Sequence, residues 1–405
     1  MEDTILSWKT RIGRISGLRK PQKEFLTHML ALFLSIKGRI NFLQLARHTQ
    51  QYGESTCRLQ FEEYVDFPAL NQEYILQKSS RHLVLAFDLS YLPKSGKATS
   101  GVGKYWSGSH QMPMWGLEAG LLSVIDIDHH TAFHLDAIQT PDKAEREAKQ
   151  IDLADHSTQA ILWCCPAIQA LSAYIALDGY FAKKEIITRL QAHLQVISRL
   201  RSHANCAYLY QGPPSAGKGA PRKYAGKINW QAPDLSYFTL HYQDQTLRVY
   251  DAKVYCRFLK QTIRVAYCQS IKELGKVSQY KIYFSTDLNL PAFMILKYYQ
   301  ARFQQEFLIR DAKQFTGLND CQARSINKLE YHWNLALTAV NLAKAEHWLN
   351  KPKDQRGAFS MSSSKTLYHN HLLIEQLFDN LPKSVQMMKN DPNIKQLYAF
   401  GAIAA

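Results

Sequence analysis

Four residues in the last third of the chain have the types and the spacing that chemistry on a phosphate requires. The pattern is Tyr-x2-Arg-x3-Glu-x6-Lys, and its members are Tyr299, Arg302, Glu306 and Lys313. A helix turns by about 100° per residue, so at these spacings all four side chains would point from one narrow face of a helix. A phenol, two cations and a carboxylate do not suit a core stripe, whereas they can surround a metal ion and a phosphate. The pattern therefore predicts one helix that carries part of a site for cutting or joining nucleic acid.

Two further acids stand where a metal site is expected. Asp88 and Asp178 each follow an apolar run, residues 83–87 and 174–177, which is typical of a strand buried on both faces. Taken alone, either aspartate could equally be a turn or cap residue. Together with Glu306 they predict a cluster of carboxylates, the ligands that hard cations such as Mg²⁺ select. Three converging carboxylates can hold two ions about 3.5–4 Å apart.

The charge balance favours a polyanionic partner. The 405 residues carry a formal net charge of +15 and a sequence pI of about 9.3, with 46% hydrophobic residues. Nucleic acid is the first candidate partner and an anionic membrane surface the second. No apolar run reaches the ~20 residues of a membrane span, and the first residues lack a signal-peptide pattern. We therefore expect no membrane association and a cytoplasmic location.

The cysteines favour reduced thiols over a disulfide framework. There are seven, an odd number, and no two of them have the C-x2-C spacing of a zinc site.

The chain is expected to begin with a helical N-terminal DNA-binding domain, residues 1–78. Helices are predicted at 21–38, 42–50 and 57–64, the last two across a turn that contains Gly53. This arrangement resembles a helix-turn-helix, with a plain three-helix bundle as the alternative.

The middle of the chain predicts an α/β fold with a mixed sheet. Residues 79–200 and 281–350 form the expected core, with strands at 83–87, 117–126, 131–138, 174–177 and 194–199. Helices are predicted at 141–160 and 181–194, a strand at 280–284, a helix from Pro291 through the motif, and a helix at 327–349. Residues 201–280 predict a β-rich insertion. Residues 351–405 predict a C-terminal helical region after a serine-rich linker at 360–364.

The chain resembles bacterial insertion-sequence transposases of the DDE type, in the group marked by a Tyr-Arg-Glu-Lys signature. The resemblance rests on Asp88 in LAFDLS, Asp178 in ALDGYF and Glu306 in YYQARFQQEFLIRDAK. It implies a ribonuclease-H-like core with a β-rich insertion between the second aspartate and the glutamate. The 128 positions from Asp178 to Glu306 (306 − 178) leave room for such an insertion. Asp287 is a rival acid, but its place ahead of a helix is typical of a cap.

The resemblance also implies a cut-and-paste reaction on DNA. Asp88, Asp178 and Glu306 would be catalytic and would hold Mg²⁺, with two ions expected and Mn²⁺ able to substitute. Hydrolysis of one strand would free a 3′-hydroxyl, which would attack the opposite strand to form a hairpin and later join target DNA. Arg302 and Lys313 would bind phosphates, and the Tyr299 hydroxyl a phosphate oxygen. The implied partners are double-stranded DNA with terminal inverted repeats, target DNA, and a second copy of the chain as a homodimer on paired ends. The implied location is nucleoid-associated.

The predicted insertion combines cations with aromatic residues, which suits nucleic-acid backbone and unpaired bases. Its candidate DNA-binding residues are Lys218, Arg222 and Lys223 in a basic loop. In the families it resembles, a tryptophan of the insertion stacks on a base flipped out during hairpin formation, which makes Trp230 the candidate here. The alternative is that Trp230 is a core residue of a small sheet.

Two alternatives to a transposase stay open at this point. One is a structure-selective DNA nuclease of the same fold without strand transfer. The other is a domesticated DNA-binding protein that has lost catalysis.

Overall fold

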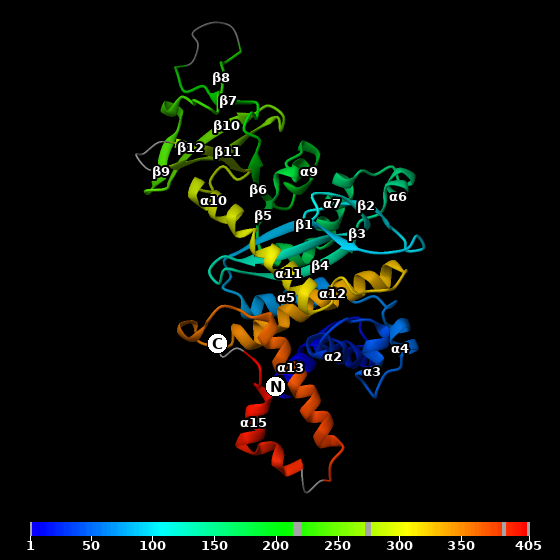
Figure 1. Cartoon of the computed structure of the whole chain (residues 1–405). Helices are drawn as coiled ribbons and strands as arrows, with labels where there is room; N and C mark the ends of the chain where they lie inside the picture. The colour runs from blue at the N-terminus through cyan, green and yellow to red at the C-terminus, as the bar shows by residue number, and fades with distance from the viewer. Residues whose placement is uncertain (1, 214–219, 272–276, 383–385, 403–405) are drawn as a thin grey trace.

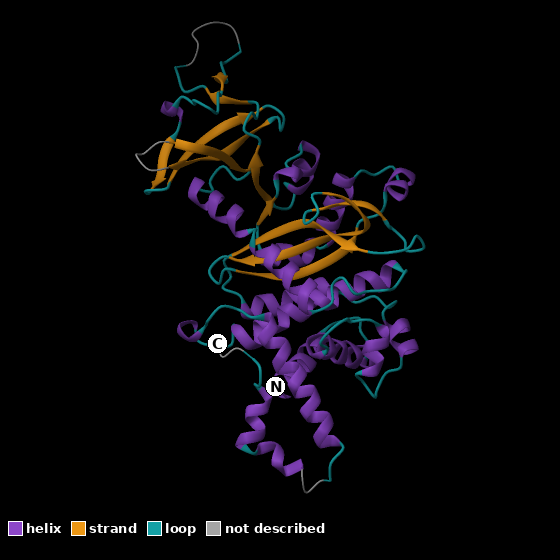
Figure 2. Ribbon diagram, in the orientation of Figure 1, coloured by secondary structure: helices purple, strands orange, loops and turns teal. Residues whose placement is uncertain are grey.

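The computed structural model describes residues 2–213, 220–271, 277–382 and 386–402. Helices from both ends of the chain gather on one side of a central sheet, and a β-rich lobe extends from the opposite side (Figures 1 and 2). The segment α10 (Ala292–Ala301) lies between the central sheet and that lobe.

The first part of the chain is helical, as predicted. Its helices are α1 (Glu2–Arg14), α2 (Lys20–Ser35), α3 (Phe42–Arg47), α4 (Glu54–Gln60) and α5 (Phe67–Lys78). The sequence pattern missed α1 and α5, although Asp66 caps α5 by accepting a hydrogen bond from the backbone of Ala69. The ring of Phe61, just after α4, packs between Phe42 and Tyr331. The N-terminal helices therefore share one hydrophobic core with the helices of the catalytic part.

The central sheet has the strand order β4-β3-β1-β5-β6, which is the order of a ribonuclease-H-like core. The strands are β1 (Leu83–Pro93), β3 (Met112–Asp126), β4 (Thr131–Gln139), β5 (Tyr174–Leu177) and β6 (Gln195–Leu200). β3 runs antiparallel to β1 and β4, whereas β1, β5 and β6 are parallel. The predicted mixed α/β fold is confirmed.

The β-rich segment continues this sheet through β12 (Val277–Ser285), which pairs with β6. In the described part of the chain one sheet of twelve strands results. Its remaining strands are β2 (Gly103–Ser107), β7 (Cys206–Leu209), β8 (Tyr224–Lys227), β9 (Thr239–Gln243), β10 (Leu247–Cys256) and β11 (Gln261–Ile271), with a 3₁₀ turn at Leu235–Tyr237 before β9. β12 crosses position 280, so the boundary proposed there between insertion and core falls within a strand.

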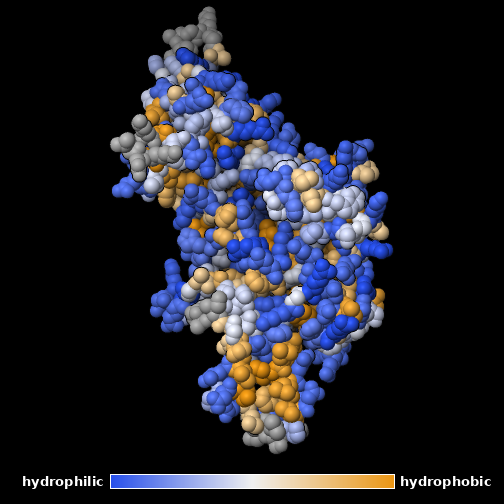
Figure 3. Space-filling view, in the orientation of Figure 1, coloured by the Kyte–Doolittle hydropathy of each residue, from blue (hydrophilic) through white to orange (hydrophobic). Residues whose placement is uncertain are grey.

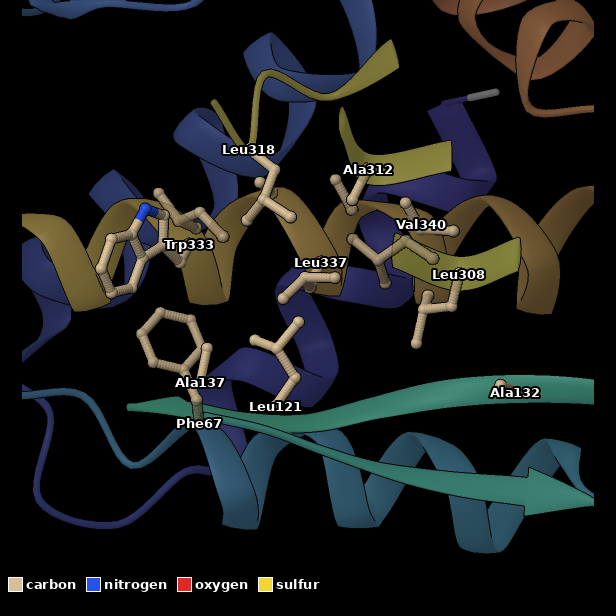
Figure 4. Packing of buried hydrophobic residues seen from close by; sticks show 14 of the residues in the cluster. Phe67, Leu121, Ala132, Ala137, Leu308, Ala312, Leu318, Trp333, Leu337 and Val340 are labelled. Atoms are coloured by element: carbon tan, nitrogen blue, oxygen red, sulfur yellow. The ribbon is translucent and has the colours of Figure 1, made fainter. Parts of the chain in front are cut away.

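Helices cover both faces of the central sheet. On β1, Val84 and Ala86 face α10, α11 (Gln304–Phe315) and α12 (Ile326–Ala343), whereas Leu85 and Phe87 face the opposite layer. That second layer contains α7 (Leu153–Trp163), α8 (Cys165–Leu171) and α9 (Lys184–Leu190). Figure 4 shows the first interface, where Leu121 of β3 lies opposite Leu337 of α12. Burial on both faces explains why the strand sequences are continuous apolar runs.

One predicted helix of this region is wrong. Residues 141–160 form α6 (Lys143–Ala148) and α7 rather than a single helix. Gln150 between them has φ of 53°, a left-handed conformation that a helix cannot continue through. Asp152 then caps α7 by accepting from the backbone of Asp155.

The C-terminal region is helical, but its predicted serine-rich linker is wrong. Residues 361–364 form the first turn of α13 (Met361–Asp379), because Ser360 caps it by accepting from the backbone of Ser363. A π turn at Lys344–Trp348 and 3₁₀ turns at Lys353–Gln355 and Met387–Asn390 connect the region, which ends in α15 (Pro392–Tyr398). Apolar side chains gather on the surface of α13 and α15 (Figure 3), among them Leu377, Leu397 and Phe400. None of the described helices is long and apolar enough to cross a membrane.

Candidate active site

Two of the predicted acids lie on neighbouring parallel strands. Phe87 of β1 is in register with Leu177 of β5, so the residues that follow them, Asp88 and Asp178, are neighbours across the sheet. Asp178 comes directly after β5. The expectation that a strand ends at Asp88 is wrong, since β1 continues to Pro93 and pairs there with β3. The two carboxylates nevertheless leave the sheet next to each other.

The motif does not lie on one continuous helix. Tyr299 belongs to α10 and Glu306 to α11, with Arg302 in a tight turn between the helices. In that turn the backbone of Phe303 bonds to Gln300, that of Gln305 to Arg302 and that of Glu306 to Phe303, at 3.2, 3.0 and 3.1 Å. These are bonds of the 3₁₀ type, which tighten the turn by one residue. Tyr299, Arg302 and Glu306 still face the aspartates.

Arg302 links two of the acids. Its Nη1 lies 3.4 Å from Asp88 Oδ2 and its Nη2 lies 3.7 Å from Glu306 Oε1. The arginine side chain is only 13% exposed, and its Nε has no hydrogen-bond acceptor among the described residues. Burial raises the pKa of Asp88 to about 6, the charge of Arg302 opposes that rise, and Asp178 and Glu306 add to it. The three carboxylates therefore share one electrostatic environment.

Tyr299 reaches the third carboxylate. Its hydroxyl donates to Asp178 Oδ1 at 3.2 Å, and its ring packs on Tyr283. Burial, and next the negative charge of Asp178, raise the pKa of Tyr299 to about 12. The phenol is therefore protonated at neutral pH and can act as a hydrogen-bond donor.

Lys313 lies two turns further along α11 and away from the acids. Its Nζ donates to the backbone carbonyl of Tyr91 at 2.8 Å. Burial lowers the pKa of Lys313 to about 8. Its contact with a DNA phosphate stays a prediction.

A cavity of about 710 Å³ opens beside the two aspartates. Glu118 of β3 lines it, is buried, and has one carboxylate oxygen without a hydrogen-bond partner in the described structure. Burial raises the pKa of Glu118 to about 7. Glu118 is not among the residues predicted from the sequence, although an acid inside the apolar run 117–125 was a signal. The exposed rings of Trp106 and Tyr180 also line the cavity.

The donor chemistry of the acids fits a hard divalent cation, because all three offer carboxylate oxygens. Their present arrangement is not that of a formed metal site, since the described residues contain no group of three His, Cys, Asp or Glu that could hold an ion. The guanidinium of Arg302 lies between Asp88 and Glu306 instead. A cation at this place would have to displace it.

The structure corrects the prediction for Trp230. Its side chain is 2% exposed, its indole nitrogen donates to Ala204 at 2.8 Å, and its ring packs against Phe238 and Tyr267. A buried indole offers no face to a base, so the structure favours the alternative of a core tryptophan.

The basic loop is described only in part. Arg222 is exposed and lies over the ring of Tyr210, and Lys223 is exposed, whereas Lys218 lies outside the described residues. Asp287 accepts from the backbone of Asn289 and from the hydroxyl of Tyr174, and so stabilises the turn before α10. The interpretation as a helix cap is wrong, because Pro291 is the N-cap of α10.

Comparison with known families identifies the class of protein. The family model described as "Transposase DDE domain" matches residues 94–342, which is 249 of the 405 positions (342 − 94 + 1). The chain therefore belongs to the DDE transposases, a family of DNA-cleaving enzymes that in general use divalent metal ions. The match includes Asp178 and Glu306 and begins six positions after Asp88 (94 − 88). No curated protein matches the chain.

Proposed function

We propose that this chain is a transposase whose active site consists of Asp88, Asp178 and Glu306. The observation that supports this most directly is the convergence of acids from two parallel strands and α11, linked through Arg302 and Tyr299. These acids would hold Mg²⁺, as one or two ions, with Mn²⁺ able to substitute. When bound, such ions would supply an activated water and stabilise the leaving oxygen of an in-line displacement at phosphorus.

The chain's own residues would position the DNA. Arg302 would leave its carboxylate partners and bind a phosphate near the cleaved bond. Its guanidinium can donate hydrogen bonds to two oxygens of that phosphate. Tyr299 would keep Asp178 oriented through the hydroxyl that already donates to it. Such positioning, together with charge stabilisation, is the main source of catalysis in phosphoryl transfer.

The proposed reaction is hydrolysis of one strand, hairpin formation by the freed 3′-hydroxyl, and joining to target DNA. A hairpin requires at least one base to leave the stack, which costs a few kcal/mol unless an aromatic surface receives it. Because Trp230 is buried, we assign that surface to Trp106 and Tyr180, whose exposed rings line the cavity beside Asp88 and Asp178.

The proposed substrates are double-stranded DNA with terminal inverted repeats and a target duplex, bound by a homodimer on paired ends. The net charge of +15 supports a polyanionic partner. The proposed contacts with the DNA backbone, apart from the active-site residues, are Lys313, Arg222 and Lys223.

The test uses isosteric variants of the acids on DNA taken from both sides of the coding sequence. Asp88→Asn, Asp178→Asn and Glu306→Gln should each abolish nicking in Mg²⁺ while DNA binding in EDTA stays within about threefold of wild type. Asp287→Asn is the matched control, because Asp287 is an acid between β12 and α10 that contacts Tyr174 and none of the three acids. It should cleave normally.

Each outcome decides between the candidate functions. Cleavage retained by any of the three variants would remove that residue from the active site. Nicking by the wild type without hairpins or joined products would favour a nuclease of the same fold. Binding without any cleavage, in Mg²⁺ or Mn²⁺, would favour a non-catalytic DNA-binding protein.

A further inference from the structure

A second cavity, of about 510 Å³, lies where the N-terminal, catalytic and C-terminal parts of the chain meet. It is lined by residues just after α2, by the end of α11 and by the start of α13. Four of its lining residues are cations, and Asp320 is its only acid among the described residues. The cations are Lys37, Arg39, Lys313 and Lys365.

Close packing of two loops builds one wall of this cavity. Gly317, after α11, has φ of 72°, and a Cβ there would lie 2.8 Å from the side chain of Ile40. Only glycine combines this conformation with such an approach. Asp320 then accepts a hydrogen bond from the backbone of Ile40 at 2.9 Å. These contacts hold Lys37 and Arg39 beside the end of α11.

The opposite wall comes from α13, which packs against α2. Lys365 is 5% exposed and donates to the carbonyl of Phe33 at 2.6 Å, and the ring of His369 contacts the carbonyl of Ser35 at 3.0 Å. Both contacts fall on the last turn of α2, whose carbonyls lack partners within the helix. α13 is therefore fixed with Lys365 against the cavity.

The charges of this cavity are not balanced by the protein. None of its four cations forms an ion pair within the described residues, and the side chains of Lys313 and Lys365 donate to neutral backbone carbonyls. An oxygen of Asp320 is engaged by the backbone of Ile40. Burial lowers the pKa of Lys365 to about 7, and the charge of Asp320 opposes that shift although the two residues form no ion pair in the described structure. Four cations against one acid leave an excess of positive charge in the cavity, which favours a ligand with negative charge.

We propose that this basic cavity binds a backbone phosphate of the DNA that the enzyme cuts. The proposal rests on the proposed function, and it adds a site formed by three separate parts of the chain. Lys313 lies seven residues after Glu306 on the same helix, about 10 Å along its axis. A strand whose cleaved bond lies at Glu306 would therefore reach the cavity within a few nucleotides. Lys37, Arg39 and Lys365 would bind there with Lys313, and would fix the angle at which the duplex enters the active site.

Lys365 also has a structural explanation, because it caps the last turn of α2. The test therefore rests first on Lys37 and Arg39, which are exposed and have no hydrogen bond or ion pair in the described structure. Their removal should leave the fold intact.

The experiment compares Lys37→Ala/Arg39→Ala with wild type on a short mixed-sequence duplex in EDTA. The slope of log binding constant against log salt should become shallower by about one, since the cavity holds one phosphate and a lost phosphate contact contributes about 0.9. Lys353→Ala/Lys395→Ala is the matched control. It removes two exposed cations that lie outside the cavity and outside the N-terminal helices, and its slope should equal that of wild type.

Two further measurements separate the explanations. Lys365→Met, with folding checked by circular dichroism, should reduce the slope by about one; if this variant does not fold, the double variant alone decides. Thermal melting in inorganic phosphate, against chloride at equal ionic strength, tests for a free anion. The proposal would be overturned if phosphate raised the melting temperature while the salt slope of DNA binding stayed unchanged in the double variant. The ligand of the cavity would then be free phosphate and not DNA.

An unchanged slope in a protein that still cleaves DNA would refute this cavity alone. A wild-type chain that binds no duplex would refute the proposed function as well.

Discussion

Replacement of Arg302 by methionine should destabilise the metal-free protein and should cost much less when Mg²⁺ is present. In the structure the guanidinium offsets the charges of Asp88 and Glu306. Methionine keeps most of the buried stem but leaves those carboxylates without a cation. If Mg²⁺ binds the same carboxylates, it has to displace Arg302 in the wild type but not in the variant.

The distances give the size of the effect. Two unit charges separated by the 3.4 Å between Arg302 Nη1 and Asp88 attract by about 5 kcal/mol at an effective dielectric constant of about 20. The Asp88 side chain is 33% exposed and that of Glu306 is 47% exposed, so solvent screens both pairs and Glu306 adds little. We therefore expect a loss of about 1–3 kcal/mol, between the values for exposed and buried ion pairs.

The pH matters because Asp88 can take up a proton instead. Burial raises the pKa of Asp88 from 3.8 to about 6 in the folded protein, so folding favours the protonated carboxyl. The stability that this protonation contributes is fully present below pH 3.8 and is lost as the pH rises through 6. Removal of Arg302 raises this pKa further. The deficit of the variant should therefore be largest at pH 8 and smaller at pH 5.

The assay is urea unfolding of wild type and Arg302→Met in EDTA and in saturating Mg²⁺ at pH 8. The deficit should shrink by at least about 1 kcal/mol on addition of Mg²⁺, because the stabilisation by a bound ligand grows with the logarithm of its affinity and the variant binds the ion without displacing an arginine. Arg310→Met is the control, since Arg310 is an exposed arginine of α11 that pairs with Asp311. A deficit of equal size with and without Mg²⁺ would refute the idea that Arg302 occupies the place of the cation.

Two further predictions concern buried residues. Trp230→Ala should lower the free energy of unfolding by about 3–5 kcal/mol, because a core ring is lost. Nicking and hairpin formation should be impaired equally, as denaturant unfolding and a cleavage gel can measure. A loss of hairpins alone would instead support a stacking role for Trp230. Burial raises the pKa of Glu330 from 4.5 to about 7, so the wild type should lose stability as the pH rises from 4.5 to 7. Glu330→Gln keeps the oxygen that accepts from the backbone of Gln139 and should be the more stable protein at pH 8, by about 2 kcal/mol, with little gain at pH 4.5. Urea unfolding at both values of pH measures the gap, and an equal gap at both would contradict the buried-acid explanation.

The sequence could predict the central sheet because its strands are buried on both faces. The run at 174–177 matches β5 at both ends, since apolar residues continue only as far as both faces are covered. The same rule placed the end of β1 too early. From Asp88 onwards only some residues of β1 are buried, so polar and apolar residues alternate irregularly there. The pairing of β1 with β3 nevertheless continues to Pro93.

The turn inside the motif could not be predicted from local preferences. The residues from Gln300 to Glu306 contain no proline or glycine, and most of them are ordinary helix formers. The 3₁₀ turn at Arg302 coincides with ion pairs to Asp88 and Glu306, and the first of these residues is more than two hundred positions away in the chain. Contacts of this kind have no signal in a local window. Glu118 and the basic cavity are hidden for the same reason, because each combines residues from distant parts of the chain.

The two sites together suggest an order of events on DNA. With its acids ionised, the active site carries three negative charges and the single positive charge of Arg302, so it repels a phosphate. The basic cavity has four cations and one acid, so it attracts a phosphate without help from a metal. DNA binding through the cavity therefore does not need Mg²⁺, whereas the approach of the cleaved phosphate to Glu306 needs added positive charge. A cation that takes the carboxylates would supply that charge, and it would also free Arg302 to bind the phosphate that lies about 10 Å along α11 from Lys313.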